Sequence, residues 1–500
     1  MAPTARPATR PWPLAPLAGF LLGAAMPLAF APFHLWWLSP LLLAALCLLW
    51  DTAGPRRAAW IGFTFGAGHF LAGTYWLYIS IHVFGGAPLA LAVGLMLLLV
   101  ALMALYFALL GWLVLRLAPV AGPVRWLLVF PAAWVLVEWL RGWLFTGFGW
   151  LGLGYAQADS WLAGYVPVLG VYGASLAMAL TAGALRCLLP GGRVRLVPAA
   201  LLVLLWAGAG GLVRLEWTSP LGEPLSVALL QGNVSQDLKW DPAQFAATLD
   251  LYEELTRAAP AQSLVVWPEA AIPALVHEVA GYLEDIRELA AAAGSEVVLG
   301  ILRFDFRSRE YENTLLALTD TPQFYVKRHL VPFGEYFPVP DWVRSGLRVL
   351  DLPYTDIAAG PAAQTPLSVA GQLIAPSICY EALFGALQLP FYPQATLLVN
   401  VSNDAWFGDS IAPHQHLQIA RMRSIEAGRW MLRSTNTGIS ALIDPAGRVV
   451  ARSPQFETHM LTGTVVGHEG TTPYMTLGNR AALLLALLLL GVGSWVARRS

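Results

Sequence analysis

The chain has 500 residues, of which 57% are hydrophobic and 12% are Asp, Glu, Lys or Arg. This composition is too apolar for a soluble globular protein of this length, so it predicts membrane-embedded segments. The formal net charge of -1, without any basic run, implies no nucleic-acid partner. The three cysteines, Cys47, Cys187 and Cys379, are too few and too scattered for a disulfide framework or a zinc site.

The first apolar stretch begins at Leu14 and has some features of a signal peptide. It runs on into further apolar segments without a small-residue cleavage site and a polar mature chain, so we expect it to be retained. Because about 20 apolar residues cross the hydrocarbon core, the sequence predicts about eight transmembrane helices. The expected spans are residues 14–31, 35–50, 58–83, 87–115, 124–145, 161–186, 196–214 and 479–497. Seven fall in residues 1–215 and the eighth in residues 475–500.

Basic residues mark every second connection between these spans. They are Arg6 and Arg10, Arg56 and Arg57, Arg116 and Arg125, Arg193 and Arg195, and Arg498 and Arg499. The intervening connections, at about 32–35, 84–87 and 146–160, carry neither Lys nor Arg. The positive-inside rule then places both termini in the cytoplasm and residues 216–474 outside it. Within one span, Glu138 and Arg141 lie three residues apart, and we expect them to pair with each other or to line a lipid cavity.

Residues 216–474 have a different pattern, in which short apolar strands alternate with helix-like stretches. The expected strands include 227–230, 264–266, 297–301, 315–318, 373–378, 396–401 and 438–443. Helical spacing of apolar residues is seen over 242–257 and 278–293. This alternation predicts a layered α/β or α-β-β-α domain.

Three strand-like runs in this domain each end on a chemically useful side chain. Ser263 to Pro268 leads to Glu269, Pro322 to Val326 leads to Lys327, and Leu373 to Ile378 leads to Cys379. Taken singly, each has a plainer interpretation: a turn carboxylate, an exposed basic residue and a small core residue. Together they are the three groups that thiol acyl transfer needs, since the thiol requires a base and the oxyanion a positive charge. We therefore predict one active site.

The sequences around these residues resemble a known family. VVWPEAAIP around Glu269, VKRHLVPFGEYFP around Lys327 and SICYEALF around Cys379 resemble the signature blocks of the nitrilase superfamily, with its Glu-Lys-Cys triad. With the apolar spans, QGNVSQDLKW at 231–240 and LLVNVSNDAWFGDS at 397–410, the whole chain resembles the bacterial apolipoprotein N-acyltransferase family. The resemblance implies a membrane α-helical bundle joined to a nitrilase-like αββα sandwich.

The resemblance also implies roles for individual residues. Glu269 would be the general base, Cys379 the nucleophile and Lys327 the cation on the oxyanion side. Glu335 would support the lysine and the base, although a surface charge in a Pro-rich loop is the plainer interpretation. The backbone N–H of Tyr380 would complete the oxyanion hole.

Three further residues are matched less firmly to a role. Glu381 resembles a residue needed near the nucleophile, and a structural ion pair is the alternative. Trp240 matches a tryptophan on a mobile loop near the site, and Trp150 lies in a segment near the lipid entrance. Either tryptophan could instead be an interfacial anchor. His414 and His416 form an isolated HxH without an acidic partner at ligand spacing, so no metal is expected, and no cofactor is implied.

The reaction implied has two steps at the bacterial inner membrane, with the catalytic domain on the periplasmic side. Cys379 would take an acyl chain from the sn-1 ester of a phospholipid such as phosphatidylethanolamine. The chain would then pass to the α-amino group of a diacylglyceryl-cysteine at the N-terminus of an apolipoprotein. Two alternatives remain open: a membrane-anchored nitrilase-type amidase that hydrolyses a small amide, and a non-enzymatic lipoprotein-binding or sorting protein.

Overall fold

The computed structural model describes residues 14–189, 195–336 and 357–499. Arg6, Arg10 and Arg193, which contribute to the expected orientation, lie outside these ranges. The chain divides into two compact units. The first runs up to Tyr78 and includes Ala87–Leu215 and the C-terminal helix, whereas the second comprises Ile79–Gly86 and Glu216–Gly478.

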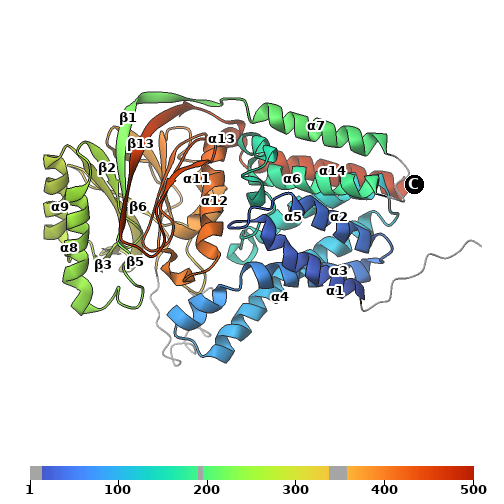
Figure 1. The fold of residues 1–500 in the computed structure, drawn as a ribbon, viewed down its shortest axis with the longest axis horizontal. Coiled ribbons are helices and arrows are strands. Elements are labelled where there is room, and N and C mark those ends of the chain that lie inside the picture. Colours follow the sequence, from blue (N-terminus) through green and yellow to red (C-terminus); the bar gives the residue numbers. More distant parts are fainter. Residues whose placement is uncertain (1–13, 190–194, 337–356, 500) are drawn as a thin grey trace, which may run out of the picture. The chain divides into compact units, whose positions relative to one another are not determined.

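The first unit is helical, and a helix occupies part of each of the eight expected spans (Figure 1). The helices are α1 (Leu14–Ala25), α2 (Leu38–Trp50), α3 (Pro55–Gly73), α4 (Leu89–Leu117), α5 (Phe130–Arg141), α6 (Val166–Leu188), α7 (Leu196–Leu212) and α14 (Arg480–Arg499). Within the described residues, three helical segments are long and apolar enough to cross a membrane: Leu89–Leu117, Trp161–Leu188 and Arg480–Arg499. The other helices are too short or, in the case of the 19-residue α3, not apolar enough, so the structure establishes apolar helices but not the full number of crossings.

Close packing of α3 depends on glycines at its contacts. A Cβ at Gly62 would lie 2.1 Å from the Phe107 carbonyl oxygen of α4, and one at Gly23 of α1 would lie 1.9 Å from the Phe65 carbonyl oxygen. Small residues let helix backbones approach each other where lipid removes the hydrophobic drive to associate. Glycine thus takes the place of a larger apolar residue where the backbone of another helix lies close.

The expected span 58–83 is wrong at its C-terminal end. Helix α3 ends at Gly73, where the amide and hydroxyl of Thr74 both donate to the Phe70 carbonyl oxygen, at 2.8 and 2.7 Å. Residues Ile79–Phe84 form a separate π-helical turn, η2, that belongs to the second unit. There the Ser80 hydroxyl donates to the Trp406 carbonyl oxygen at 2.8 Å. Hydropathy alone predicts one continuous span here, because both segments are apolar.

Glu138 and Arg141 of α5 are buried but have different partners. The Glu138 carboxylate accepts hydrogen bonds from the Ser175 hydroxyl at 2.5 Å and from the Leu153 amide at 2.9 Å. Arg141 donates to the carbonyl oxygens of Phe148 and Trp150, at 2.5 and 2.6 Å. Both side chains therefore fasten the 148–153 segment to the helices, and the expected direct pairing between them is absent.

The second unit contains two β-sheets. The first has the strand order β13-β1-β2-β4-β5-β6, with β3 also paired to β4, and the second has the order β12-β11-β10-β9-β8-β7. The strands of the first sheet are β1 (Thr218–Gln231), β2 (Ser263–Val266), β3 (Ile272–Leu275), β4 (Glu296–Asp305), β5 (Glu310–Leu318), β6 (Gln323–Val326) and β13 (His459–Gly470). Those of the second are β7 (Leu367–Val369), β8 (Gln372–Ile378), β9 (Leu397–Ser402), β10 (Met431–Thr435), β11 (Ala441–Ile443) and β12 (Val449–Arg452).

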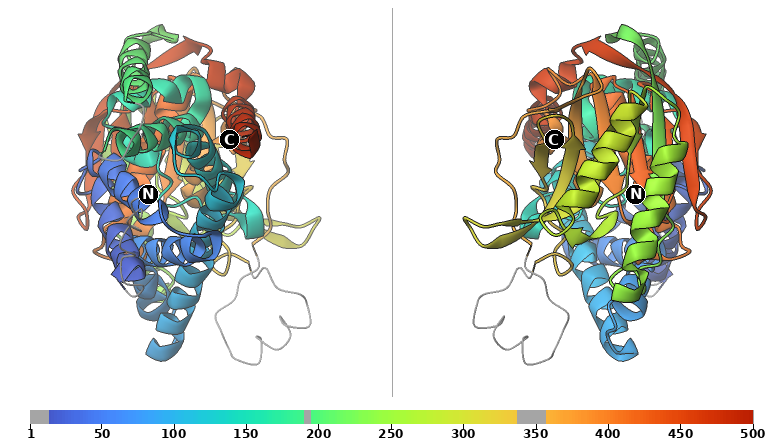
Figure 2. Two further views of the ribbon diagram at one scale, coloured as in Figure 1. Left: turned by 90° about the vertical axis from the view of Figure 1, so that its right-hand side faces the viewer. Right: turned by 90° about the vertical axis from the view of Figure 1, so that its left-hand side faces the viewer.

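Helices cover the outer faces of the two sheets (Figure 1). Helices α8 (Pro242–Ala258) and α9 (Ala280–Ala292) run side by side over the first sheet, as Figure 2 shows. Helix α12 (Ala412–Ala427) lies on the opposite side, and α11 (Gly385–Gln388) and α13 (Pro473–Leu477) are short. The second unit is therefore an α-β-β-α sandwich, as the sequence predicted.

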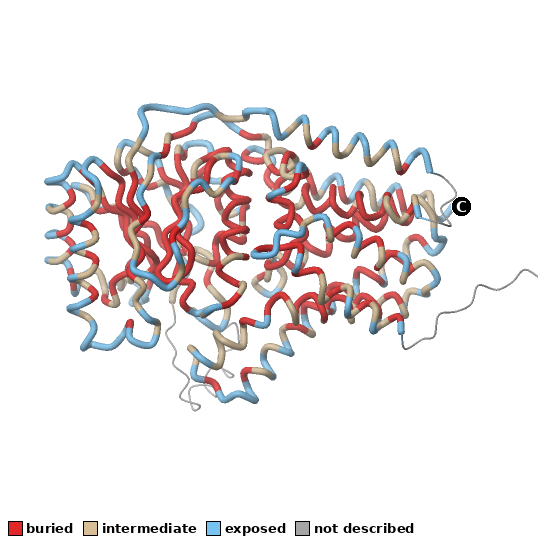
Figure 3. The backbone as a smooth tube through the Cα atoms, in the orientation of Figure 1, coloured by how far each residue is buried: buried red, intermediate tan, exposed pale blue. Residues whose placement is uncertain are grey.

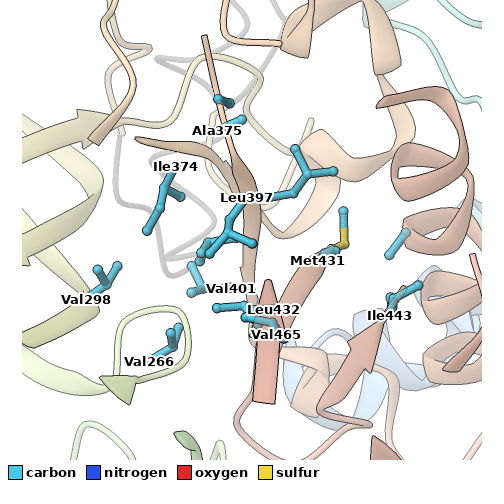
Figure 4. Close-up of a cluster of buried hydrophobic side chains, with 14 of the residues drawn as sticks. Val266, Val298, Ile374, Ala375, Leu397, Val401, Met431, Leu432, Ile443 and Val465 are labelled. Atoms are coloured by element: carbon cyan, nitrogen blue, oxygen red, sulfur yellow. The ribbon is translucent and has the colours of Figure 1, made fainter. Parts of the chain in front are cut away.

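Successive side chains along the strands of the first sheet point to opposite faces, and each face is packed against its own hydrophobic core. Val227 and Leu229 point into the core shared with the second sheet, whereas Ala228 and Leu230 pack against α8 and α9. Residues i and i+2 of a strand share a face, so β1 can be apolar on both sides. Figure 4 shows the inter-sheet core, in which Val266 faces Leu397, Val401 and Leu432. In Figure 3 the central strands of the sandwich are buried, and the outer helices are exposed on one side.

The expected strands fall within or beside observed ones, but several strands were not predicted. These are β3, β7, β10, β12 and β13. Strand β10 was not predicted because it contains a charged residue, Arg433, although that residue is fully buried in the structure. The expected strand at 438–443 begins later, at Ala441.

Candidate active site

The three residues predicted to act together each follow a strand. Lys327 comes directly after β6 and Cys379 directly after β8, while Glu269 is separated from β2 by Trp267 and Pro268. The Glu269 segment lies tightly against β4 at Gly300, where an added Cβ would come within 2.6 Å of the Glu269 Cα. Hydrogen bonds between Gly300 and the amide of Ala271 and carbonyl of Pro268 hold this approach.

Lys327 is the central cation of the site. Its ammonium lies 3.2 Å from Glu269 Oε1 and 2.8 Å from Glu335 Oε1, and its side chain is 1% exposed. Burial by itself lowers the pKa of Lys327, but the two carboxylates outweigh burial and raise the pKa well above its ordinary value. Lys327 is therefore a permanent positive charge, and Glu335 is a direct partner of it.

The Glu269 carboxylate is held on both oxygens. Oε1 accepts from the Asn313 side-chain amide at 2.8 Å as well as from Lys327, and Oε2 accepts from the Asn403 backbone amide at 2.9 Å. Burial disfavours the charged form, but the Lys327 ammonium and these hydrogen bonds lower the pKa of Glu269 below its ordinary value. Asn313 also donates to Glu335 at 3.0 Å. Glu269 is thus an ionised carboxylate held in a fixed orientation.

Cys379 occupies a strained turn at the end of β8. Its φ is +50°, a left-handed conformation that costs free energy in a residue other than glycine. Burial, and then the Glu269 carboxylate, raise the pKa of the Cys379 thiol, while Lys327 opposes them. The thiol is therefore neutral at rest, close enough to both residues for their charges to act on it. Such a thiol needs a base to take its proton as it attacks.

A second polar network contacts Cys379. The His416 ring of α12 has Nδ1 2.9 Å from Asp404 Oδ1 and Nε2 3.1 Å from the Cys379 carbonyl oxygen. The Ser402 hydroxyl donates to Asp404 Oδ1 at 2.8 Å, and Ser402 also lowers the pKa of the Cys379 thiol, against the larger effect of burial. The network therefore links Ser402 and Asp404, through His416, to the backbone of Cys379.

Asp404 is the fixed charge of this network. Burial by itself raises the pKa of Asp404, but Arg433 and His416 outweigh burial and lower it well below its ordinary value. Arg433 donates to Asp404 Oδ2 at 2.9 Å and also to the Asn400 side-chain oxygen. Both ring nitrogens of His416 therefore have a partner within the fold.

Glu381 joins the Cys379 turn to the segment that carries Lys327. Its carboxylate accepts from the backbone amides of Arg328 at 2.7 Å, His329 at 3.1 Å and Ile378 at 2.8 Å. The Tyr325 hydroxyl donates to the same group at 2.8 Å. Burial raises the pKa of Glu381, and these hydrogen bonds oppose the effect. The ion pair considered from the sequence is thus replaced by a set of hydrogen bonds to backbone and tyrosine donors.

The remaining predicted residues lie in different surroundings. Tyr380 follows the nucleophile in a 3-10 turn, and its ring packs 5.2 Å from that of Phe384. Trp240 is 51% exposed, on the loop between β1 and α8. Trp150 belongs to the first unit, where its ring is buried beside Trp76 at 5.0 Å between ring centroids.

Several residues in contact with the site were not singled out from the sequence. Asn313 lies inside β5, where nothing local distinguishes it from a strand-edge polar residue. Asn403 lies in the quoted block at 397–410, and that block was the available signal. Lys239 of the neighbouring block is buried with its Nζ 3.4 Å from the Glu269 carbonyl oxygen.

Comparisons with known proteins follow the division of the chain. Residues 22–184 match the apolipoprotein N-acyltransferase N-terminal domain, and residues 226–472 match the carbon-nitrogen hydrolase family. The apolipoprotein N-acyltransferase of Methylococcus capsulatus is 44% identical over 475 residues, covering 94% of this chain and 94% of its own. The chain belongs to the apolipoprotein N-acyltransferase family. The Azotobacter vinelandii apolipoprotein N-acyltransferase is 46% identical, covering 97% of this chain and 95% of its own.

Among solved structures, a CN-hydrolase superfamily protein from Xanthomonas campestris matches 53% of this chain and 97% of its own, with 21% identity and a TM-score of 0.36. In this chain the two matches join the N-terminal domain of apolipoprotein N-acyltransferases to a carbon-nitrogen hydrolase domain. An ionised carboxylate, a permanent cation and a neutral thiol are the groups that acyl transfer through a cysteine thioester requires.

Proposed function

We propose that this chain transfers an acyl chain from a phospholipid, through a thioester on Cys379, to the α-amino group of the N-terminal diacylglyceryl-cysteine of apolipoproteins. The observation that carries the proposal is the cluster of Glu269, Lys327 and Cys379 in a chain whose full-length relatives bear the name apolipoprotein N-acyltransferase. The sn-1 ester of phosphatidylethanolamine is the proposed donor.

In the first half-reaction, Glu269 takes the proton of the Cys379 thiol while the sulfur attacks the ester carbonyl carbon. Negative charge then develops on the carbonyl oxygen, where the Lys327 ammonium and the Tyr380 backbone N–H would stabilise it. Collapse of this intermediate breaks the ester bond and expels the lysophospholipid alkoxide. That alkoxide takes the proton from Glu269, which leaves the thioester and an ionised base.

In the second half-reaction, the α-amine of the acceptor attacks the thioester carbonyl. The amine must be unprotonated to attack, and Glu269 takes the proton that the new C–N bond releases. The C–S bond then breaks, and the departing Cys379 sulfur recovers a proton from Glu269. Covalent transfer lets two bulky lipids use one site in turn, provided that water is kept from the thioester.

We further propose that the chain spans the bacterial inner membrane about eight times and that the catalytic unit faces the periplasm. Three long apolar helices and the alternation of arginines between spans support this arrangement. Trp240 and Trp150 are the proposed substrate contacts. The exposed indole of Trp240 suits contact with an acyl chain, because it lies on the loop beside Glu269.

The proposal is tested by mass spectrometry of the purified, detergent-solubilised protein after incubation with dioleoyl-phosphatidylethanolamine. We expect an oleoyl adduct on the peptide that contains Cys379, its transfer to a diacylglyceryl-cysteine peptide, and no adduct in Cys379→Ala. Glu284→Gln, in an exposed helical pair, is the matched control and should form the adduct normally. Release of free oleate without acylation of the peptide would instead identify a hydrolase, and the proposal would be wrong.

A further inference from the structure

A second lysine, Lys239, lies beside the base. It sits on the loop between β1 and α8, and its side chain is 2% exposed. Its neighbours Leu238 and Trp240 are 48% and 51% exposed, so the ammonium points into the protein while both flanking apolar side chains reach outward. The Lys239 Nζ lies 3.4 Å from the backbone carbonyl oxygen of Glu269.

This ammonium is poorly satisfied for a buried charge. It has three N–H donors and makes one long hydrogen bond, and no carboxylate oxygen in the described part of the chain lies within 4.0 Å of it. Lysines are rarely buried without a partner, because desolvating a charge is costly. Burial lowers the pKa of Lys239 to about 8, and the nearby negative charge of Glu269 limits the decrease.

Lys239 is not needed to orient the Glu269 carboxylate. Both of its oxygens are occupied by Lys327, Asn313 and the Asn403 amide, and Lys327 in turn is shared with Glu335. Lys239 reaches the backbone of Glu269 rather than its carboxylate. The free donors of Lys239 are therefore available to an anion that enters the site.

We propose that Lys239 binds the phosphate group of the acyl donor. The inference rests on the proposed function, in which the sn-1 ester of a glycerophospholipid reaches Cys379. In such a lipid only the glycerol backbone separates the reacting ester from the phosphate, so an ester at Cys379 places the phosphate close to the residues around Glu269. Lysine is a common phosphate ligand, and the exposed Leu238 and Trp240 beside it suit the apolar parts of the lipid.

The assignment distinguishes the two half-reactions. The donor carries a phosphate, whereas the diacylglyceryl-cysteine acceptor carries none. Loss of the Lys239 charge should therefore slow formation of the thioester much more than its aminolysis.

The experiment compares two donors that differ in the phosphate headgroup: dioleoyl-phosphatidylethanolamine and dioleoylglycerol. The rate of Cys379 acylation by each is measured by mass spectrometry in the wild type, Lys239→Gln and Lys239→Arg. We expect Lys239→Gln to lower the rate with the phospholipid at least tenfold more than the rate with dioleoylglycerol, and Lys239→Arg to recover most of the difference. Because both donors are tested on the same preparation, the ratio of the two acylation rates does not depend on the folded fraction of the variant.

If Lys239→Gln lowers the acylation rate equally with both donors, the inference is overturned, and Lys239 is a positioning residue for Glu269. Inorganic phosphate tests whether Lys239 binds a free phosphate anion rather than the phosphate of a phospholipid. If it inhibits the dioleoylglycerol reaction through Lys239 while the donor ratio stays unchanged, the site binds a free anion and the lipid assignment is wrong. If the wild type forms no adduct from phosphatidylethanolamine at all, the proposed function itself fails, which is a separate outcome.

Discussion

His416 contacts the backbone of Cys379: its Nε2 lies 3.1 Å from the Cys379 carbonyl oxygen. The contact fixes a residue whose φ of +50° is unfavourable for any side chain larger than hydrogen. Because the other ring nitrogen is held by Asp404, the ring cannot turn away without breaking a second contact. The strained nucleophile turn is thus braced from α12, an element far from it in the chain.

Replacing His416 tests this bracing. We expect His416→Leu to lower the rate of Cys379 acylation about tenfold or more, because a small misplacement of a nucleophile has a large effect on rate. His416→Gln, which keeps a side-chain amide, should retain more of the rate. Both rates are measured by mass spectrometry of stopped reactions. His277→Leu is the control, because His277 packs edge-on against the Phe306 ring. Equal rates for the Leu and wild-type proteins would contradict the role.

Asn313 offers a test of how Glu269 stays ionised. In Asn313→Asp a third carboxylate would lie beside Glu269 and Glu335, and like charges raise the pKa of a carboxyl group. Glu269 would then be protonated at a higher pH, so the acid limb of the acylation profile should move to higher pH and activity should recover as the pH rises. Asn313→Ala, which removes the hydrogen bonds without adding charge, should shift the limb less. Superimposable profiles for the two variants would refute this account.

Glu381 is expected to matter more for stability than for chemistry. In Glu381→Gln, an amide N–H₂ would face backbone N–H groups that the carboxylate now accepts from. Leaving buried donors unpaired should cost about 3 kcal/mol of the free energy of unfolding. The predicted drop in the unfolding midpoint is measured by fluorescence in detergent, with Glu284→Gln as the exposed control. A midpoint unchanged from wild type would argue that Glu381 is not the link between the two segments.

The two half-reactions should respond differently to pH. The pKa of Glu269 lies below its ordinary value of 4.5 and that of Cys379 above its ordinary value of 9.0, so both keep their resting states near neutrality. Acylation by dioleoylglycerol should therefore be flat from about pH 6 to about pH 7.5. Aminolysis of the preformed thioester should rise with pH until the acceptor amine, with a pKa of about 8, is neutral. A flat second profile would count against attack by the free amine.

Much of the site could be predicted because its signals are local. A short apolar run that ends on Glu269, Lys327 or Cys379 is visible in the printed sequence, and the flanking blocks identify the family. The alternation of strands and helices predicts a layered domain, and the resemblance to the nitrilase superfamily narrows it to an αββα sandwich. The extent of the span at 58–83 could not be predicted, because hydropathy does not register the helix end at Gly73.

The sequence by itself determined the kind of chemistry: a carboxylate, an ammonium and a thiol at strand ends, in a chain with apolar helices. The tertiary structure decided which other residues contact these three groups. Asn313, His416 and Lys239 reach the site from a strand interior, a helix and a loop, and sequence distance does not foretell such contacts. The physical reason is that strand order and register set these distances, and both depend on packing across the whole domain.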